Sequence, residues 1–96
     1  MFIISITYTS DLTEIDRHLD EHVGYLNNQY KLGNFQLSGR KEPRTGGVII
    51  SSVSSKSELN EILALDPFFR EKLARYEITE IVPTKAAPKL EHLLEA

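Results

Sequence analysis

Apolar and polar residues alternate at the start of the chain. In an extended segment, one set of side chains shares a face and is wholly apolar: Phe2, Ile4, Ile6 and Tyr8. The opposite set is mixed: Ile3, Ser5 and Thr7. This alternation predicts a β-strand over residues 2–8 with one apolar face and one mixed face.

A helical spacing follows over residues 12–31. Apolar side chains recur three and four positions apart, which is typical of a helix with one buried stripe. The stripe consists of Leu12, Ile15, Leu19, Val23, Leu26 and Tyr30. Asp11 precedes it and Glu14 lies three residues further on, a spacing that suits an N-terminal cap. Gly33 is placed to end the helix as a left-handed residue.

Three further strands and two further helices are predicted. Phe35 and Leu37 alternate with polar residues in a second strand, and residues 48–53 form a third that is rich in β-branched side chains. A capping box, Ser55 to Glu58, opens a second long helix whose apolar stripe is Leu59, Ile62, Leu63 and Leu65. Pro67 suits the first turn of a short helix that carries Phe68, Phe69 and Leu73.

Residues 76–82 complete the set as a fourth strand, and residues 84–96 form an extended tail that ends in a helical turn. The order is therefore βαββαβ. Right-handed crossovers place both helices on the same face of one antiparallel sheet, which predicts an α+β, ferredoxin-like fold. The domain spans residues 1–83, and the tail over residues 84–96 either docks on a partner subunit or frays.

The sheet face away from the helices is expected to be partly polar. It would carry the mixed set of the first strand together with Asn34, Gln36 and Ser38 of the second. Two interpretations fit: a monomer with a half-wet sheet, and a two-fold dimer whose facing sheets enclose a partly polar cavity. We expect the homodimer, because isologous dimers are the commonest assemblies.

Composition narrows the class of protein. The chain has 96 residues, 41% of them apolar and 26% charged, as in an ordinary soluble domain. The net charge of −3 argues against a nucleic-acid partner. The absence of cysteine excludes disulfides, thiolate catalysis and cysteine metal sites. No signal peptide and no membrane-spanning apolar run are apparent, so we expect a cytoplasmic protein without a membrane partner.

A cationic, glycine-rich loop stands between the second and third strands. Arg40, Lys41 and Arg44 could bind a carboxylate or phosphate, or they could form a solvated loop that discourages strand pairing. Gly46 and Gly47 could expose backbone N–H groups to a ligand or simply form the turn. The predicted substrate-binding residues are Ser38, Gly39, Arg40, Arg44, Gly46 and Gly47. The expected partner is a small anionic molecule.

Two residues could carry proton chemistry. His22 lies at the border of the helical stripe, where it is either a proton-transfer group or a hydrogen-bonded boundary histidine. Asp66 precedes Pro67 and suits a helix cap, and its second oxygen could orient a histidine. His18 and His22 have a spacing that could hold a metal, but no third ligand is evident. We therefore expect no metal and no cofactor.

Five short features in this order resemble the YciI-like family over residues 1–83. They are the first strand, His22-Val23-Gly24-Tyr25-Leu26, Ser38-Gly39, Gly46-Gly47-Val48-Ile49-Ile50 and Asp66-Pro67-Phe68. The resemblance implies a dimeric α+β barrel and an active site that pairs a histidine with an aspartate, here His22 and Asp66. Arg40 stands where the family often has proline, which indicates a more cationic pocket. A few relatives are linked to dehydrochlorination of chlorinated hydroxyquinols, and the wider superfamily includes lactone isomerases and small monooxygenases.

Two functions are compared on this basis. The first is a cofactor-independent enzyme of lyase or isomerase type, in which a pair formed by His22 and Asp66 moves a proton on a small anionic substrate. The second is a non-catalytic module that binds or senses a small anion in the same pocket. An RNA-binding sheet is not expected, because the first and third strands lack exposed stacking aromatics.

Overall fold

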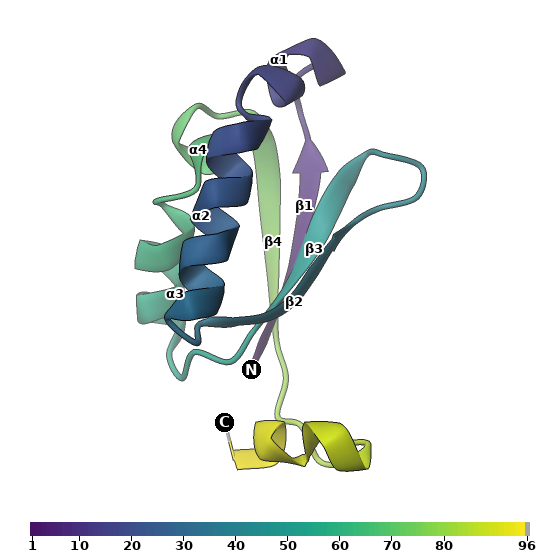
Figure 1. The fold of residues 1–96 in the computed structure, drawn as a ribbon, viewed down its shortest axis with the longest axis vertical. Helices are drawn as coiled ribbons and strands as arrows, with labels where there is room; N and C mark the ends of the chain where they lie inside the picture. Colours follow the sequence, from purple (N-terminus) through teal and green to yellow (C-terminus); the bar gives the residue numbers. More distant parts are fainter. Residues whose placement is uncertain (96) are drawn as a thin grey trace.

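The computed structural model describes residues 1–95 and contains one four-stranded antiparallel sheet. Its strands are β1 (Phe2–Tyr8), β2 (Phe35–Arg40), β3 (Gly46–Ser51) and β4 (Ala74–Glu80). Their spatial order is β2-β3-β1-β4, so β1 lies between β3 and β4 (Figure 1). β3 begins two residues before the predicted strand, and β4 both begins and ends two residues earlier than predicted.

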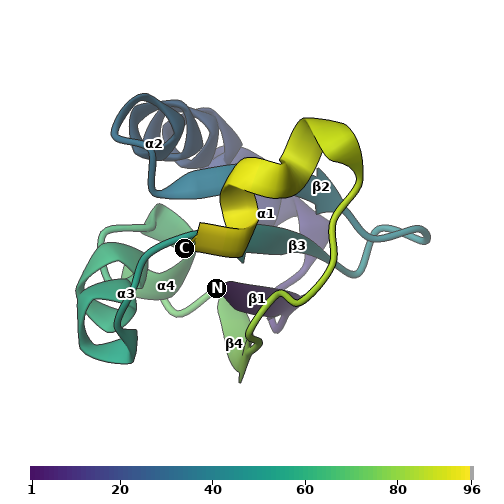
Figure 2. The ribbon, with the colours of Figure 1, turned by 90° about the horizontal axis from the view of Figure 1, so that it is seen from below.

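The α-helices of residues 1–95 are α1 (Leu12–Arg17), α2 (Leu19–Lys31), α3 (Lys56–Leu63) and α4 (Pro67–Arg70). Three of them, α2, α3 and α4, lie on one side of this sheet, and α1 lies at the end of the sheet beyond β1 (Figure 1). Figure 2, which looks along the strands, shows α2 and α3 on the same side, with the other face of the sheet left open. The predicted α+β, ferredoxin-like arrangement is therefore confirmed.

The core lies between the sheet and these helices. The strand faces turned toward the helices carry residues with almost no exposure, and α3 and α4 cover them with further apolar side chains. The principal members of the core are Phe2, Ile4, Ile6, Phe35, Ile49, Leu59, Leu63 and Phe68. The apolar face predicted for residues 2–8 is thus the core face of β1, although Tyr8 at its end is only half-buried.

The structure confirms two predicted helix N-terminal caps and one predicted helix-ending glycine. The side chain of Asp11 accepts a hydrogen bond from the backbone N–H of Glu14 at 3.0 Å. That of Ser55 accepts from the N–H of Glu58 at 3.1 Å. Gly33 has a φ of +78°, the left-handed conformation expected of the residue that ends α2.

The first predicted helix is broken, which the apolar spacing did not indicate. His18 has φ −108° and ψ 5°, so α1 ends at Arg17 and α2 begins at Leu19. The predicted stripe is also partly wrong, because Leu12 is 44% exposed and Val23 is 45% exposed. The face of α2 that turns inward instead carries His22, Tyr25, Leu26 and Gln29.

The open face of the sheet also differs from the prediction, because β2 contains an irregularity. The register with β3 shifts between Phe35 and Leu37, so Leu37 pairs with Ile50 and Ser38 pairs with Ile49. A shift of one residue moves the following side chains to the opposite face. Ser38 therefore lies on the helix side of the sheet, whereas Leu37 lies on the open face and is 61% exposed.

Asn34 also departs from the predicted open face. Its side-chain amide donates to the amide oxygen of Gln29 at 2.8 Å, and Gln29 is a buried residue of α2. Gln36 donates instead to the hydroxyl oxygen of Ser52 at 2.9 Å. The open face is consequently more apolar than expected, with Ile3, Leu37, Val48 and Ile50 in neighbouring register positions.

The chain beyond β4 stands apart from the rest. It runs without regular structure to a 3-10 helix, η1 (Pro88–Glu95), which lies beyond the end of the sheet (Figure 1). Val82 in the connection is 82% exposed, and Leu90 in η1 is 48% exposed. Ala96 lies outside the described residues, and the division into a domain over 1–83 and a tail over 84–96 stays a prediction.

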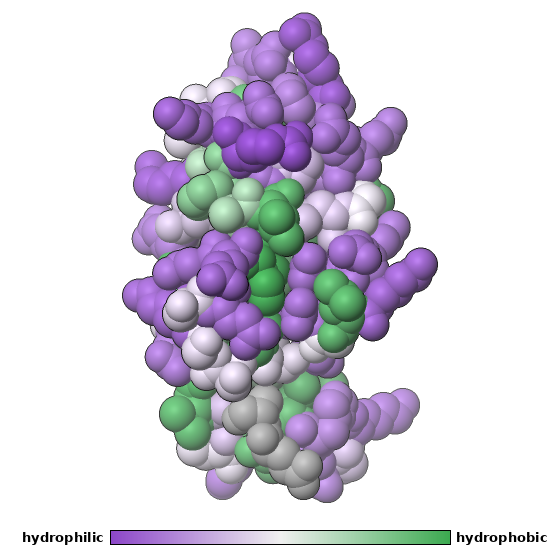
Figure 3. All heavy atoms as spheres, turned by 90° about the vertical axis from the view of Figure 1, so that its left-hand side faces the viewer, coloured by the Kyte–Doolittle hydropathy of each residue, from purple (hydrophilic) through white to green (hydrophobic). Residues whose placement is uncertain are grey.

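The view in Figure 3 turns the left-hand side of Figure 1 toward the reader. Hydrophilic residues dominate the upper end of this surface, and hydrophobic residues are exposed in a band near its middle. Within residues 1–95, none of the helices combines the length and the apolar character needed to cross a membrane.

Candidate active site

His22 and Asp66 are 44 residues apart in the sequence and in direct contact in the fold. The Nδ1 atom of His22 lies 2.8 Å from Oδ1 of Asp66. The side chain of His22 is 12% exposed and that of Asp66 is fully buried. The inward face of α2 supplies the imidazole, and the turn between α3 and α4 supplies the carboxylate.

Asp66 holds its position through two further hydrogen bonds. Its Oδ1 also accepts from the backbone N–H of Phe68 at 3.0 Å, which is the N-terminal cap of α4. Its Oδ2 accepts from the hydroxyl of Tyr76 on β4. The carboxylate therefore caps a helix and orients the imidazole at the same time, so the two roles weighed for it on sequence are not exclusive.

The ring of His22 is also fixed by stacking. It lies parallel to the ring of Phe68, with centroids 4.1 Å apart and an angle of 8° between the planes. Tyr25 lies on the same helix with its ring centroid 6.3 Å from that of His22, and its hydroxyl donates to the carbonyl oxygen of Ile62 at 2.8 Å. These contacts leave the imidazole little freedom to turn.

The partner of Nδ1 determines the tautomer of His22. A carboxylate only accepts hydrogen bonds, so the proton of a neutral imidazole belongs on Nδ1, and Nε2 keeps its lone pair. Within residues 1–95, Nε2 has no hydrogen-bond partner, and no side-chain nitrogen or oxygen is both buried and unpaired. Nε2 is therefore accessible as a proton acceptor.

His22 lines a cavity of about 490 Å³ on the helix side of the sheet. Most of its wall is apolar and includes the side chains of Ile6, Leu19, Val23, Leu26, Ile49 and Phe68. Its polar side chains come from Tyr8, Asp16, His22, Ser38, Arg40 and Arg44. α2 and the β2–β3 hairpin of one chain form this cavity.

The two arginines of the cationic loop differ in their partners. Arg44 donates to Oδ1 of Asp16 on α1 at 2.5 Å, and both side chains line the cavity. Arg40 also lines the cavity, and among the side chains of residues 1–94 its guanidinium makes no ion pair or hydrogen bond. Lys41 turns to the open sheet face, where its ammonium donates to the hydroxyl of Thr7 at 3.2 Å.

Close backbone contacts require glycine at two positions of the cavity wall. A Cβ on Gly46 would lie 1.8 Å from the carbonyl oxygen of Ile6, and one on Gly47 would lie 2.9 Å from that of Gly39. Both distances are too short for a side chain. Gly39 lines the cavity beside them, and a Cβ on it would meet nothing within 4 Å.

Ser38 reaches the same cavity because of the irregularity in β2. Its hydroxyl is hydrogen-bonded to the hydroxyl of Tyr30 on α2. All six predicted binding residues thus line one cavity with His22, while Asp66 stands behind the imidazole.

Several residues of the site were not predicted from the sequence. Tyr76 is the main omission, and its signal was a tyrosine on the core face of a strand, where a buried hydroxyl needs a partner. Asp16 and Tyr8 gave no signal, because only the fold brings them to the cavity. His18, considered with His22 as a metal ligand, has its Nδ1 3.1 Å from the carbonyl oxygen of Glu14. Among residues 1–95, no group of three or more side chains could hold a metal ion.

The charge of Asp66 affects the pKa values of two tyrosines, Tyr25 and Tyr76. Burial raises the pKa of Tyr76 well above its ordinary value, and the charge of Asp66 and the hydrogen bond to it raise this pKa further. Burial and then the charge of Asp66 also raise the pKa of Tyr25. Both hydroxyls therefore stay protonated near neutral pH, and Tyr76 acts as a stable donor to the carboxylate.

Fold and geometry together define a ferredoxin-like α+β protein with a carboxylate–imidazole pair beside a cavity. The model of the YCII-related domain matches residues 1–85, and the chain belongs to this family, as the YciI-like motifs predicted. A search of curated proteins gave no match.

Among solved structures, the chain is similar to 5-chloro-2-hydroxyhydroquinone dehydrochlorinase from Burkholderia phenoliruptrix AC1100, solved in complex with 2,5-dihydroxybenzoquinone. The TM-score is 0.73 and the sequence identity 19%, over 83% of this chain and 91% of that chain. At this identity the likeness supports the fold alone.

Proposed function

We propose that this chain is a cofactor-independent enzyme that moves a proton on a small anionic substrate, with His22 as general base and acid. The observation that carries the proposal is the 2.8 Å contact between Nδ1 of His22 and the buried carboxylate of Asp66, beside a cavity that Nε2 can reach. A fixed tautomer and an accessible lone pair are what a general base needs.

The reaction begins when Nε2 takes a proton from an acidic C–H or O–H group of the substrate. The imidazole becomes a cation, and the adjacent carboxylate of Asp66 stabilises that charge. In an elimination, the electron pair left behind forms a double bond and expels a leaving group as an anion. In an isomerisation, the protonated imidazole returns the same proton to another atom of the substrate.

The cavity supports a ring-sized substrate that bears an anionic group. Its apolar wall suits the ring, and the guanidinium of Arg40 suits the anion. The similar solved structure belongs to a dehydrochlorinase bound to a six-membered ring compound, and loss of hydrogen chloride is an elimination. We propose an elimination for this chain as well.

We also propose that two chains form a homodimer through their open sheet faces. Leu37 is 61% exposed there, and with Val48 and Ile50 it lines a second hollow of about 280 Å³. An exposed apolar surface of this kind is typical of an interface. The tail carries exposed Leu90 and Leu94, and we propose that it docks on the partner subunit.

Hydrogen–deuterium exchange on bound ligands tests the catalytic role while the natural substrate is still unidentified. A thermal-shift screen of small ring carboxylates first finds ligands, since a ligand at 100 times its Kd adds about 2.7 kcal/mol of stability. Each ligand is then incubated with the protein in D2O, and NMR measures the loss of its exchangeable C–H signal. We expect His22→Gln to slow this exchange by about 10²–10⁴-fold, the usual contribution of a general base.

His92→Gln is the matched control, because His92 lies on η1 and is exposed. It should exchange at the rate of the unaltered protein. If His22→Gln retains near-normal exchange, the proposed role of His22 is wrong. If ligands bind the unaltered protein and none exchanges, the alternative of a non-catalytic anion-binding module is favoured.

A further inference from the structure

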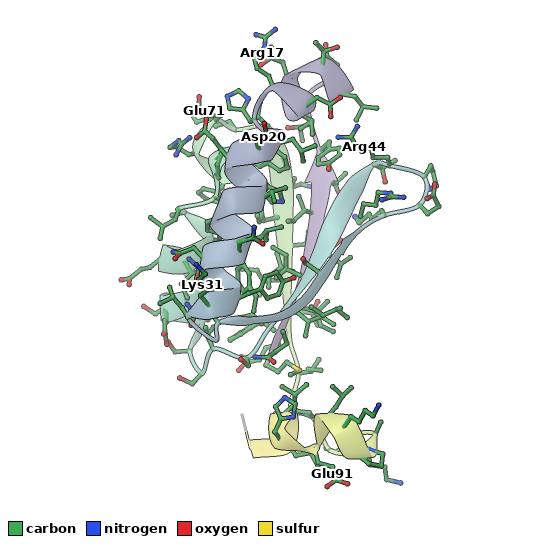
Figure 4. The ribbon with its side chains drawn as sticks, in the orientation of Figure 1. Arg17, Asp20, Lys31, Arg44, Glu71 and Glu91 are labelled. Atoms are coloured by element: carbon green, nitrogen blue, oxygen red, sulfur yellow. The ribbon has the colours of Figure 1, made fainter. Side chains whose placement is uncertain are left out.

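The ion pair between Asp16 and Arg44 joins two segments that are far apart in the sequence. Arg44 lies in the loop between β2 and β3, and Asp16 lies on α1, with 2.5 Å between Nη2 and Oδ1. Figure 4 shows Arg44 between α1 and this loop. Both residues line the cavity that contains His22, so the pair forms part of the wall a ligand would meet.

The break at His18 gives α1 a direction of its own, separate from that of α2. Asp16 is the one carboxylate among the residues that line the cavity. Glu14, also on α1, pairs with Arg17 at 2.9 Å and does not line the cavity. The side-chain hydrogen bond to Asp16 raises the pKa of Arg44.

The two arginines at the cavity therefore differ in whether an acidic side chain neutralises them. The positive charge of Arg44 is matched by Asp16, whereas Arg40 has no partner among the side chains of residues 1–94. His22 faces Asp66 through Nδ1 and presents a neutral lone pair at Nε2. The cavity consequently offers one uncompensated cation to an incoming ligand.

We propose that Asp16 is a specificity residue: by pairing with Arg44, it leaves Arg40 as the single anion-binding group and restricts the cavity to ligands with one negative charge. The inference deepens the proposed function by naming the charge of its substrate. A second carboxylate on the ligand would have to displace Asp16 from Arg44 or lie beside it unpaired. Displacement only exchanges one charged hydrogen bond of Arg44 for another, so the second carboxylate adds little to the binding free energy. A second carboxylate that lies unpaired beside Asp16 weakens binding, because like charges repel.

Benzoate, phthalate and isophthalate are suitable probes. They share one ring, which the apolar wall can accept, and they carry one carboxylate or two at different spacings. Isothermal titration calorimetry at low ionic strength, where charge interactions are least screened, measures their association constants. We expect the unaltered protein to bind benzoate more tightly than either dianion.

Asp16→Asn releases Arg44 without removing it. This variant should raise the association constant of at least one dianion about tenfold, equivalent to about 1.4 kcal/mol, while benzoate changes much less. Asp16→Asn with Arg44→Gln should cancel the gain, because the released guanidinium is then absent. The side chain of Asp16 is 54% exposed, so the fold should tolerate the change, and Asp16→Ser serves as a second variant.

Asp20→Asn is the matched control. Asp20 is exposed on the first turn of α2, outside the cavity wall, and its substitution changes the net charge by the same amount (Figure 4). The proposal is overturned if Asp20→Asn gives an equal gain, if neither Asp16 variant favours a dianion, or if the unaltered protein already binds a dianion as tightly as benzoate.

The binding measurements are independent of turnover. A charge preference that shifts with Asp16, together with exchange that does not depend on His22, would sustain this inference and refute the proposed function. Exchange that depends on His22, with no shift in charge preference, would give the opposite result.

Discussion

Replacing Asp66 with alanine tests whether this carboxylate is the structural centre of the site. The side chain is fully buried and accepts from the backbone N–H of Phe68, from Nδ1 of His22 and from the hydroxyl of Tyr76. Loss of a helix cap costs about 1 kcal/mol. Each of the other two donors, left without an acceptor, costs about 1–3 kcal/mol.

The expected loss for Asp66→Ala is therefore about 3–7 kcal/mol, against a total stability of about 5–15 kcal/mol for a domain. Asp66→Asn keeps the shape and one acceptor oxygen, so about 1.5–3 kcal/mol should be lost with the charged hydrogen bonds. Urea unfolding followed by circular dichroism measures both values, with the slope of free energy against urea checked for constancy.

Asp11→Ala is the matched control, because Asp11 is an exposed cap that accepts one hydrogen bond, from the N–H of Glu14. It should cost about 1 kcal/mol. The excess of Asp66→Ala over Asp11→Ala then measures the buried network. An equal cost for the two substitutions would show that Asp66 is no more than a helix cap and that its buried hydrogen bonds add no stability.

Three other predictions concern the tyrosines, a tight glycine and the open sheet face. The pKa values of Tyr25 and Tyr76 are raised in the fold, so the free energy of unfolding should be intact below about pH 10 and fall above it. The expected loss is up to about 1.4 kcal/mol per pH unit for each tyrosine, which urea unfolding from pH 9 to 11 and an absorbance titration would measure. An absorbance titration in which all four tyrosines of the folded protein ionise near pH 10 would contradict this. Gly46→Ala should destabilise the protein by several kcal/mol in thermal unfolding, because its Cβ would overlap the carbonyl oxygen of Ile6. A Cβ on Gly24 of α2 meets nothing within 4 Å, so Gly24→Ala should stabilise by about 0.5–1 kcal/mol, and equal effects of the two substitutions would contradict the predicted clash. Leu37→Asp should convert the proposed dimer to a monomer, as measured by sedimentation velocity, and Leu65→Asp, at another exposed leucine, should leave the dimer intact. A protein that is monomeric before any substitution would disprove the sheet-face interface.

Much of the fold could be predicted from local sequence signals. The alternation of residues 2–8, the capping residues Asp11 and Ser55, and the left-handed Gly33 each depend on the chemistry of a few neighbouring residues. Element order and right-handed crossovers then leave few topologies, and the ferredoxin-like one is correct.

Features without a local signal were missed. No proline or glycine marks the break at His18, and the apolar spacing runs through it. The shift in β2 likewise has no sequence mark, yet it decides that Ser38 faces the cavity and Leu37 faces away. Patterns of period two or 3.6 give the faces of regular elements, so a single irregular residue reverses them.

The residues of the candidate site likewise fall into those with a sequence signal and those without one. Motifs shared with the family pointed to His22, Asp66 and the glycines of the hairpin, and the cationic composition of the loop pointed to Arg40 and Arg44. The structure brings these residues together. Asp16 and Tyr76 belong to no such motif. Their places depend on the angle of α1 and the register of β4, which long-range packing determines.

The position of the proton on the neutral His22 ring is the most direct test of the proposed carboxylate–imidazole pair. Long-range ¹H–¹⁵N correlation spectra of ¹⁵N-labelled protein, recorded at an alkaline pH where imidazoles are neutral, distinguish the two tautomers of each ring. We expect a proton on Nδ1 of His22 and an unprotonated Nε2, with this preference lost in Asp66→Ala. A proton on Nε2 in the unaltered protein would contradict this expectation, because the nitrogen that faces the cavity could then not accept a proton.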